Sequence, residues 1–219
     1  MAYWASGDLE AANQVFADYT MKLRTAGNIP DAISTSVVLA DIRLALGHLQ
    51  EAIRTCEQLL QFVMDQGEPI SLDTADLYRE LSELYLEQGN LEAVAQHLQR
   101  SKELGEKADL PVWRYRWYIA QARHNETQGD LDGALALLDQ AERLYIRTPL
   151  PNVHPISAMK ARIWVAQGRL TQALEWASEQ GLSADDDLGY LNEFQSAITP
   201  VLYPSIVPMR VKPSLGIIM

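Results

Sequence analysis

Charged side chains recur at a regular spacing along the chain, and they are the residues best suited to bind a ligand. Asp41, Glu83, Arg123 and Arg162 each stand six residues before a glycine, and these glycines are 39 to 42 residues apart. Guanidinium groups pair well with oxyanions such as carboxylates and phosphates. The spacing therefore predicts a row of polar groups, acidic at one end and basic at the other. Such a row would suit a carboxylate, a sugar phosphate or a peptide terminus.

Two further arginines extend the row. Arg79 lies one helical turn before Glu83, and Arg116 lies two turns before Arg123, so each pair shares a helix face. The candidate ligand-binding residues are Asp41, Arg79, Glu83, Arg116, Arg123 and Arg162. A ladder of ion pairs between neighbouring helices explains the same pattern, because partly exposed pairs are common and individually weak. The sequence leaves both interpretations open, and the two are compatible.

Other reactive residue types form no recognisable site. One aromatic cluster is present, formed by Trp113, Tyr115, Trp117 and Tyr118. Either a ligand-stacking platform or ordinary packing between helices explains it. The four histidines are scattered, without the i, i+4 spacing and carboxylate support of a metal site. The run at 185–187 is three aspartates, which favours a helix N-terminus over a metal site. We predict no enzyme, no catalytic residue, no metal and no cofactor, since no cluster of titratable groups is evident.

Composition narrows the class of protein further. The net charge of -11 argues against binding to nucleic acid or to anionic lipid. No stretch of 18 apolar residues is present, so no membrane span is expected. Cys56 is the only cysteine, which excludes a disulfide within the chain and suits the cytoplasm. We expect its thiol to be buried in a core.

A repeated motif defines the elements that must position the charged residues. The pattern Gly-x-Leu-x-x-(Ala/Val) begins at Gly7, Gly47, Gly89, Gly129 and Gly168. Proline precedes four of these glycines by 17 to 20 residues, at Pro30, Pro69, Pro111 and Pro151. Proline suits the start of a helix and glycine suits the turn after one. Each repeat therefore reads as a proline, a helix A, a glycine turn and a helix B.

Small residues keep the same phase as the glycines. Ala40, Ser82, Ala122 and Ala161 stand seven residues before a glycine, where a small side chain lets two helices approach closely. Five residues after the glycines stand Ala12, Ala52, Val94, Ala134 and Ala173. The predicted fold class is all-α, a right-handed α-solenoid of tetratricopeptide-like helix-turn-helix repeats with a period of about 40 residues. Its concave wall, lined by the A helices, is the expected binding surface.

The two ends of the chain depart from the repeat. We predict a helical-repeat domain at 1–195, with about four and a half repeats, and an irregular proline-rich tail at 196–219. The chain begins near the end of an A helix, and its composition changes after Gln195. Our hypothesis is that truncation or a frameshift near Gln195 produced a non-native tail. Incomplete repeats at the ends would favour self-association.

Several segments resemble the helical-repeat region of MalT-like, LuxR-type ATP-dependent transcriptional regulators. They include AYWASGDLEAA from Ala2, LADIRLALGHLQEAIRTCEQ from Leu39, QGDLDGALALLDQAERLY from Gln128 and LSADDDLGYLNEF from Leu182. The resemblance covers roughly residues 2 to 194. It implies only the middle, sensor part of such regulators, because neither a phosphate-binding loop nor a DNA-recognition helix is present in this sequence.

These observations lead to one functional expectation and two alternatives. We expect a sensor module that binds a small-molecule inducer, or a regulatory protein or peptide, in its concave groove and does not itself contact nucleic acid. The first alternative is a stand-alone scaffold that binds a protein peptide. The second, more remote alternative is an enzyme.

Overall fold

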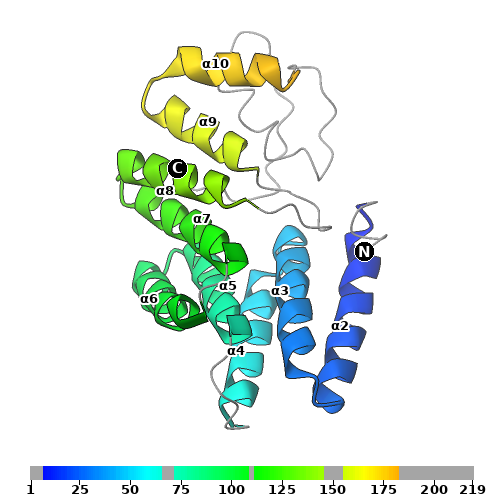
Figure 1. The fold of residues 1–219 in the computed structure, drawn as a ribbon. Helices are drawn as coiled ribbons and strands as arrows, with labels where there is room; N and C mark the ends of the chain where they lie inside the picture. Colours follow the sequence, from blue (N-terminus) through cyan, green and yellow to red (C-terminus); the bar gives the residue numbers. More distant parts are fainter. Residues whose placement is uncertain (1–6, 66–71, 109–110, 146–154, 183–219) are drawn as a thin grey trace. The chain divides into compact units, whose positions relative to one another are not determined.

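The computed structural model describes residues 7–65, 72–108, 111–145 and 155–182. These residues form helices joined by short turns, without a strand among them (Figure 1). The helices are α2 (Leu9–Thr25), α3 (Ile29–Ala45), α4 (Leu49–Asp65), α5 (Leu72–Gln88), α6 (Leu91–Ala108), α7 (Pro111–Thr127), α8 (Leu131–Arg143), α9 (Ile156–Ala166) and α10 (Leu170–Glu179). The all-α prediction is confirmed.

The chain divides into two compact units, Met1–Thr148 and Pro149–Met219. The first unit contains helices α2 to α8, and the second contains α9 and α10. The prediction of one repeat domain at 1–195 is not tested by this division. The predicted tail at 196–219 and the aspartates at 185–187 lie outside the described residues.

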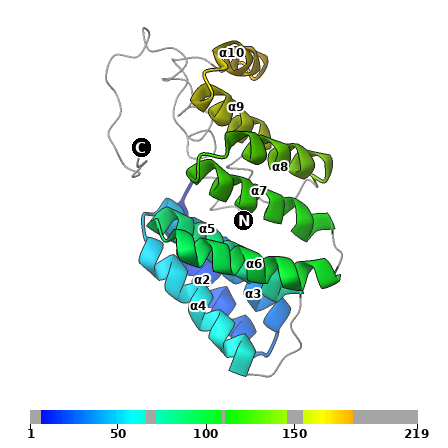
Figure 2. The same ribbon diagram turned by 90° about the vertical axis from the view of Figure 1, so that its left-hand side faces the viewer.

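Helices of the first unit alternate between two roles. The A helices α3, α5 and α7 end just before a repeat glycine, and the B helices α2, α4, α6 and α8 follow one. Each helix packs against the next in the chain, and α5 also packs against both α3 and α7 (Figures 1 and 2). The A helices therefore form one continuous layer with α5 at its centre.

The five repeat glycines adopt one conformation. Their φ angles are 80°, 80°, 79°, 81° and 74° at Gly7, Gly47, Gly89, Gly129 and Gly168. Residues with a side chain rarely adopt such positive φ angles, so glycine is favoured at this turn. The leucine two residues later is the first residue of the B helix at each of these turns. The motif thus marks the turn and the helix start together.

Capping and proline placement explain other helix starts. Asp8, Asn90 and Asp130 each follow a repeat glycine, and their side-chain oxygens accept a backbone N–H three residues on, at 3.1, 3.2 and 3.0 Å. Such caps satisfy amide groups that have no partner inside the helix. Pro30 is the second residue of α3 and Pro111 is the first of α7, as the repeat predicts. Pro69 and Pro151 lie outside the described residues.

The small residues in phase with the glycines lie at the helix contacts. Ala40, Ser82, Ala122 and Ala161 are fully buried on the A helices. The B-helix set of Ala12, Ala52, Val94, Ala134 and Ala173 is equally buried. Their burial confirms both predicted sets. A larger side chain at these places would hold the paired helices apart.

Each unit has its own apolar core. In the first unit, Leu77, Leu81 and Leu84 of α5 pack with Ile53 and Cys56 of α4 and further buried residues of α3. Cys56 is a free, buried thiol, as predicted. In the second unit, Ala158 and Ala161 of α9 pack with Trp176 and Ala177 of α10. None of the described helices is both long enough and apolar enough to cross a bilayer.

Candidate functional site

Charged side chains of α3, α5 and α7 meet on the A-helix layer. We call Asp41, Asp76, Arg79, Glu80, Glu83, Glu87, Arg116 and Arg123 the charged row. The row contains five of the six residues that the sequence singled out. The sixth, Arg162, lies on α9 and so belongs to the second unit, which is described by itself.

Arg79 is the centre of the charged row. Its Nε donates to Asp76 Oδ1 at 2.7 Å, and its Nη2 donates to Glu80 Oε2 at 3.1 Å. Its Nη1 binds Glu83 Oε1, one turn further along α5. The side chain is almost completely buried, so these three carboxylates replace the water that a guanidinium normally binds.

Two rungs join α5 to α7. Arg116 Nη1 donates to Asp76 Oδ2 at 2.8 Å, and Arg123 Nη1 donates to Glu83 Oε2 at 2.8 Å. Arg123 Nη2 also binds Glu87. In both 2.8 Å rungs the partners are 40 residues apart, so each rung joins the same position of consecutive repeats. The ion-pair ladder that the sequence left open as an alternative is present here.

Burial and the arginines shift the pKa values of two acids of the row in opposite directions. Burial tends to raise the pKa of Asp76, but Arg79 and Arg116 outweigh it and hold that pKa below its usual value. Burial and the nearby Asp41 raise the pKa of Glu80 well above its usual range, despite the attraction of Arg79. The two arginines thus favour the ionised form of Asp76, whereas burial opposes the ionised form of Glu80.

Asp41 lies at the α3 end of the row, and its carboxyl group differs from that of Asp76 in its pKa and in its ion pairing. Burial and repulsion from Glu83 raise its pKa to about 7, against the opposing attraction of Arg79 and Arg116. In the part of the chain that the structure describes, no arginine or lysine forms an ion pair with Asp41. The row thus ends on a carboxyl group that is about half ionised at neutral pH.

The sequence analysis missed Asp76, Glu80 and Glu87. A signal for Asp76 was available, because Asp76 and Arg116 each stand 13 residues before a repeat glycine. Glu80 interrupts an apolar pattern, since Val38, Ala120 and Met159 occupy its position in the other repeats. Glu87 carries no comparable signal, because it is exposed near the end of α5.

The aromatic cluster joins helices. Trp113 is buried, and its Nε1 donates to Ser101 Oγ of α6 at 3.1 Å. The Ser101 hydroxyl donates in turn to the Ala75 carbonyl of α5 at 2.8 Å. Trp117 Nε1 donates to the Leu98 carbonyl at 3.1 Å. These bonds support the packing interpretation, because both indole N–H groups donate to the neighbouring helix α6.

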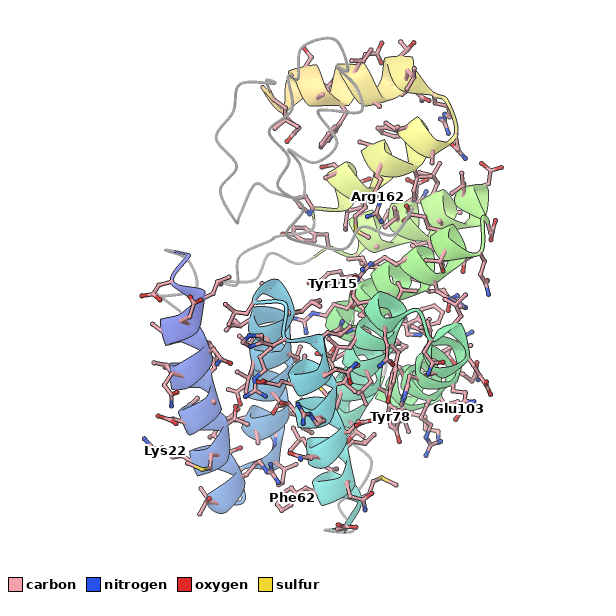
Figure 3. All side chains as sticks on the ribbon, turned by 180° about the vertical axis from the view of Figure 1, so that it is seen from behind. Lys22, Phe62, Tyr78, Glu103, Tyr115 and Arg162 are labelled. Carbon is pink, nitrogen blue, oxygen red and sulfur yellow. The ribbon has the colours of Figure 1, made fainter. Side chains whose placement is uncertain are left out.

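Two of the described histidines, His97 and His124, pack against other helices or lie buried. The His97 ring of α6 stacks on the Tyr85 ring, with 5.2 Å between the ring centroids. It also contacts the ring of Tyr78 of α5, labelled in Figure 3, with 5.7 Å between the centroids. His124 is buried on α7, and burial lowers its pKa. Among the described residues, no group of three or more histidine, cysteine, aspartate or glutamate side chains is arranged to hold a metal ion.

The helix pairs, their glycine turns and the shared core define a protein of the tetratricopeptide-like helical-repeat class. Two crystal structures of a Podosopora anserina putative kinesin light chain with nearly identical TPR-like repeats are similar to this chain. The first has a TM-score of 0.52 at 19% identity, over 91% of this chain and 90% of that one. The second has a TM-score of 0.53 at 18% identity, over 90% and 92%. At such identity the likeness concerns the fold alone.

The sequence assigns the chain to a particular family within this class. The family model of the MalT-like TPR region matches residues 1–201, and the chain belongs to that family. No curated protein matches the chain. The resemblance seen in the sequence is thereby confirmed as far as the repeat region is concerned.

Proposed function

We propose that this chain is the recognition module of a MalT-like, LuxR-type transcriptional regulator, and that its partner binds at the charged row. The proposed partner is a small-molecule inducer or a regulatory protein. In this proposal the module binds and does not catalyse, which is typical of tetratricopeptide-like repeats. Its state would be passed to ATPase and DNA-binding domains elsewhere in the regulator.

The observation that carries the proposal is the position of the charged row. Ionic side chains are rarely buried in a helical core unless they are paired. Here three A helices each contribute to one network, and several members remain partly accessible, including Glu83 at 21% and Arg116 at 26% of side-chain exposure. A ligand at this surface would contact consecutive repeats together. Its binding would therefore change how those repeats pack.

A thermal-shift screen of sugars, phosphorylated sugars and short peptides tests the proposal. A ligand at 100 times its Kd stabilises the folded state by about 2.7 kcal/mol. Arg123→Ala should abolish the shift, because Arg123 connects α7 to the row. The matched control is Arg54→Ala, an exposed arginine on α4 outside the row. Each shift is measured from the variant's own midpoint, since Arg123→Ala lowers the starting stability.

The results separate the candidate functions. A shift that survives Arg123→Ala means that the ligand binds elsewhere, and the charged row is then not the site. The stand-alone scaffold remains the second candidate. A coding region for an ATPase upstream and for a helix-turn-helix domain downstream would favour the regulator, and their absence would favour the scaffold.

A further inference from the structure

The charged row has an internal imbalance of charge. Its guanidinium groups belong to Arg79, Arg116 and Arg123, and its carboxyl groups belong to Asp41, Asp76, Glu80, Glu83 and Glu87. The arginines all come from α5 and α7. The contribution of α3 to the row is Asp41. Helix α3 therefore adds a carboxyl group to the row and no guanidinium, whereas α7 adds two guanidinium groups that bind the carboxylates of α5.

The only basic residue of α3 is turned away from the row. Arg43 donates through Nε to Asn13 Oδ1 of α2 at 3.2 Å. Its Nη1 binds the Thr55 hydroxyl of α4 and donates to the Glu51 carbonyl at 3.4 Å. Arg43 is thus committed to the neighbouring B helices, and it does not offset the charge of Asp41.

The same repeat position can be compared between two pairs of neighbouring A helices, α3 with α5 and α5 with α7. Asp41, Glu83 and Arg123 occupy one repeat position on consecutive A helices. Between α5 and α7 this position joins a carboxylate to a guanidinium, since Arg123 binds Glu83 at 2.8 Å and also binds Glu87. Between α3 and α5 it sets carboxyl group against carboxyl group, and Glu83 repels the charge on Asp41. A guanidinium beside Asp41 would convert the second arrangement into the first.

We propose that the α3 end of the charged row binds an arginine side chain of a partner protein, with its guanidinium beside Asp41. This inference rests on the proposed function and narrows the partner to a protein with an accessible arginine. Arginine is favoured over lysine because the planar fork of a guanidinium can bind two carboxylates at once, as Arg123 does. The net charge of -11 attracts such a partner at long range and disfavours nucleic acid.

Binding of this kind depends on pH in a defined direction. Only ionised Asp41 attracts a guanidinium, and its pKa of about 7 makes it roughly 10% ionised at pH 6 and roughly 90% at pH 8. The affinity should therefore rise about tenfold over this range. The charged and titratable groups around Asp41 are Cys56 of α4, Asp76, Arg79, Glu80 and Glu83 of α5, and Arg116 of α7.

The test titrates the protein with an acetylated, amidated pentapeptide that has one arginine between glycines, followed by NMR of the backbone amides. A citrulline peptide, with the same shape and no charge, is the ligand control. Asp41→Asn should weaken binding of the arginine peptide at least tenfold at pH 8 and remove the pH dependence. Asp18→Asn, an exposed acid on α2, changes the net charge equally and should leave binding unchanged.

Several outcomes would overturn the inference. They are equal binding of the two peptides, equal loss in the Asp41 and Asp18 variants, or unchanged binding after Asp41→Asn. Free L-arginine that binds as tightly as the peptide would replace the partner protein with a small molecule, and would also contradict it. Thermal melting at pH 8 checks that the Asp41→Asn variant is folded. We expect it to fold, because the substitution removes a charge that Glu83 repels.

Failure of this inference and failure of the proposed function remain distinguishable. If the arginine peptide does not bind but a screened ligand loses its shift on Arg123→Ala, the charged row is a recognition surface with another ligand. If neither experiment shows binding at the row, both are wrong.

Discussion

Helices α3 and α5 occupy consecutive places in the A-helix layer but bury different chemistry at the same two positions. Ten and nine residues before their repeat glycines, α3 has Val37 and Val38, whereas α5 has Arg79 and Glu80. All four are buried, at 8%, 8%, 6% and 3% exposure. The helix geometry therefore accommodates either an apolar pair or an ionic pair at this place.

The two solutions have different requirements. A buried valine is stabilised by the apolar area that it removes from water, and it needs no particular partner. A buried guanidinium is tolerated only while its carboxylates are in place, because an unpaired buried charge is very costly. The ionic solution thus makes α5 depend on α7, which supplies Arg116 to Asp76 and Arg123 to Glu83. The apolar solution places no such demand on α3.

The largest expected effect comes from breaking the ionic solution at its centre. Arg79→Ala leaves Asp76, Glu80 and Glu83 without their shared guanidinium in a buried place. We expect a loss of about 3–5 kcal/mol in the free energy of unfolding. Urea denaturation measures it. A loss below about 1 kcal/mol would mean that the network behaves like a set of surface ion pairs.

A smaller effect should follow from giving α5 the apolar pair of α3. The double variant Arg79→Val, Glu80→Val removes a buried acid together with the buried base. It should lose less stability than Arg79→Ala, by about 1–3 kcal/mol, because replacing a buried pair with apolar side chains is often close to neutral. The two variants are compared by the same urea denaturation. Equal losses would show that the positions are not interchangeable between repeats.

The smallest expected effect concerns a third position of the same pattern. His124 of α7 stands five residues before its glycine, where α3 has Ile42 and α5 has Leu84. Burial lowers the pKa of His124, so the folded state favours the neutral ring. Stability should therefore fall as pH drops below about 6.5, the value for an unperturbed histidine. His124→Leu should stabilise the protein by about 1 kcal/mol and weaken this pH dependence.

Thermal melting at pH 8 and at pH 5.5 tests the His124 prediction. The difference between variant and wild type should be larger at pH 5.5. A difference that does not change with pH would mean that the ring stays neutral in both states or is protonated in both.

Periodic features were predictable from the sequence. Each of them meets one local requirement. The glycines provide a positive φ, the small residues allow a close helix contact, and Cys56 fills an apolar place. A single position along the repeat is enough to specify each of them. The same phase placed Arg79, Glu83, Arg116 and Arg123 on related helix faces. It could not decide whether the arginines face a ligand or one another.

The pairing within the charged row depends on distances between helices. Whether Arg116 binds Asp76 is decided by how α7 packs against α5, and the linear sequence does not contain that separation. Glu80 was missed for a related reason, because an acid at an apolar position is usually a surface residue. Its burial is understandable only with Arg79 beside it. The pairing of Arg79 with Glu80 could therefore be found only from the structure.

The contacts across three of the hairpins have a consequence for how such a protein can vary. In two hairpins the residue four before the glycine contacts the residue eight after it, through a hydrogen bond between Arg43 and Thr55 in one and a ring stack of Tyr85 on His97 in the next. In the α9–α10 hairpin, Trp164 packs against the cluster that includes Trp176. Because the glycine turn joins the two helices in the same way each time, the residue types of this side-chain contact can change in one hairpin without a change in the others. Mutational drift can therefore adjust the rigidity of a single hairpin while its neighbours keep theirs.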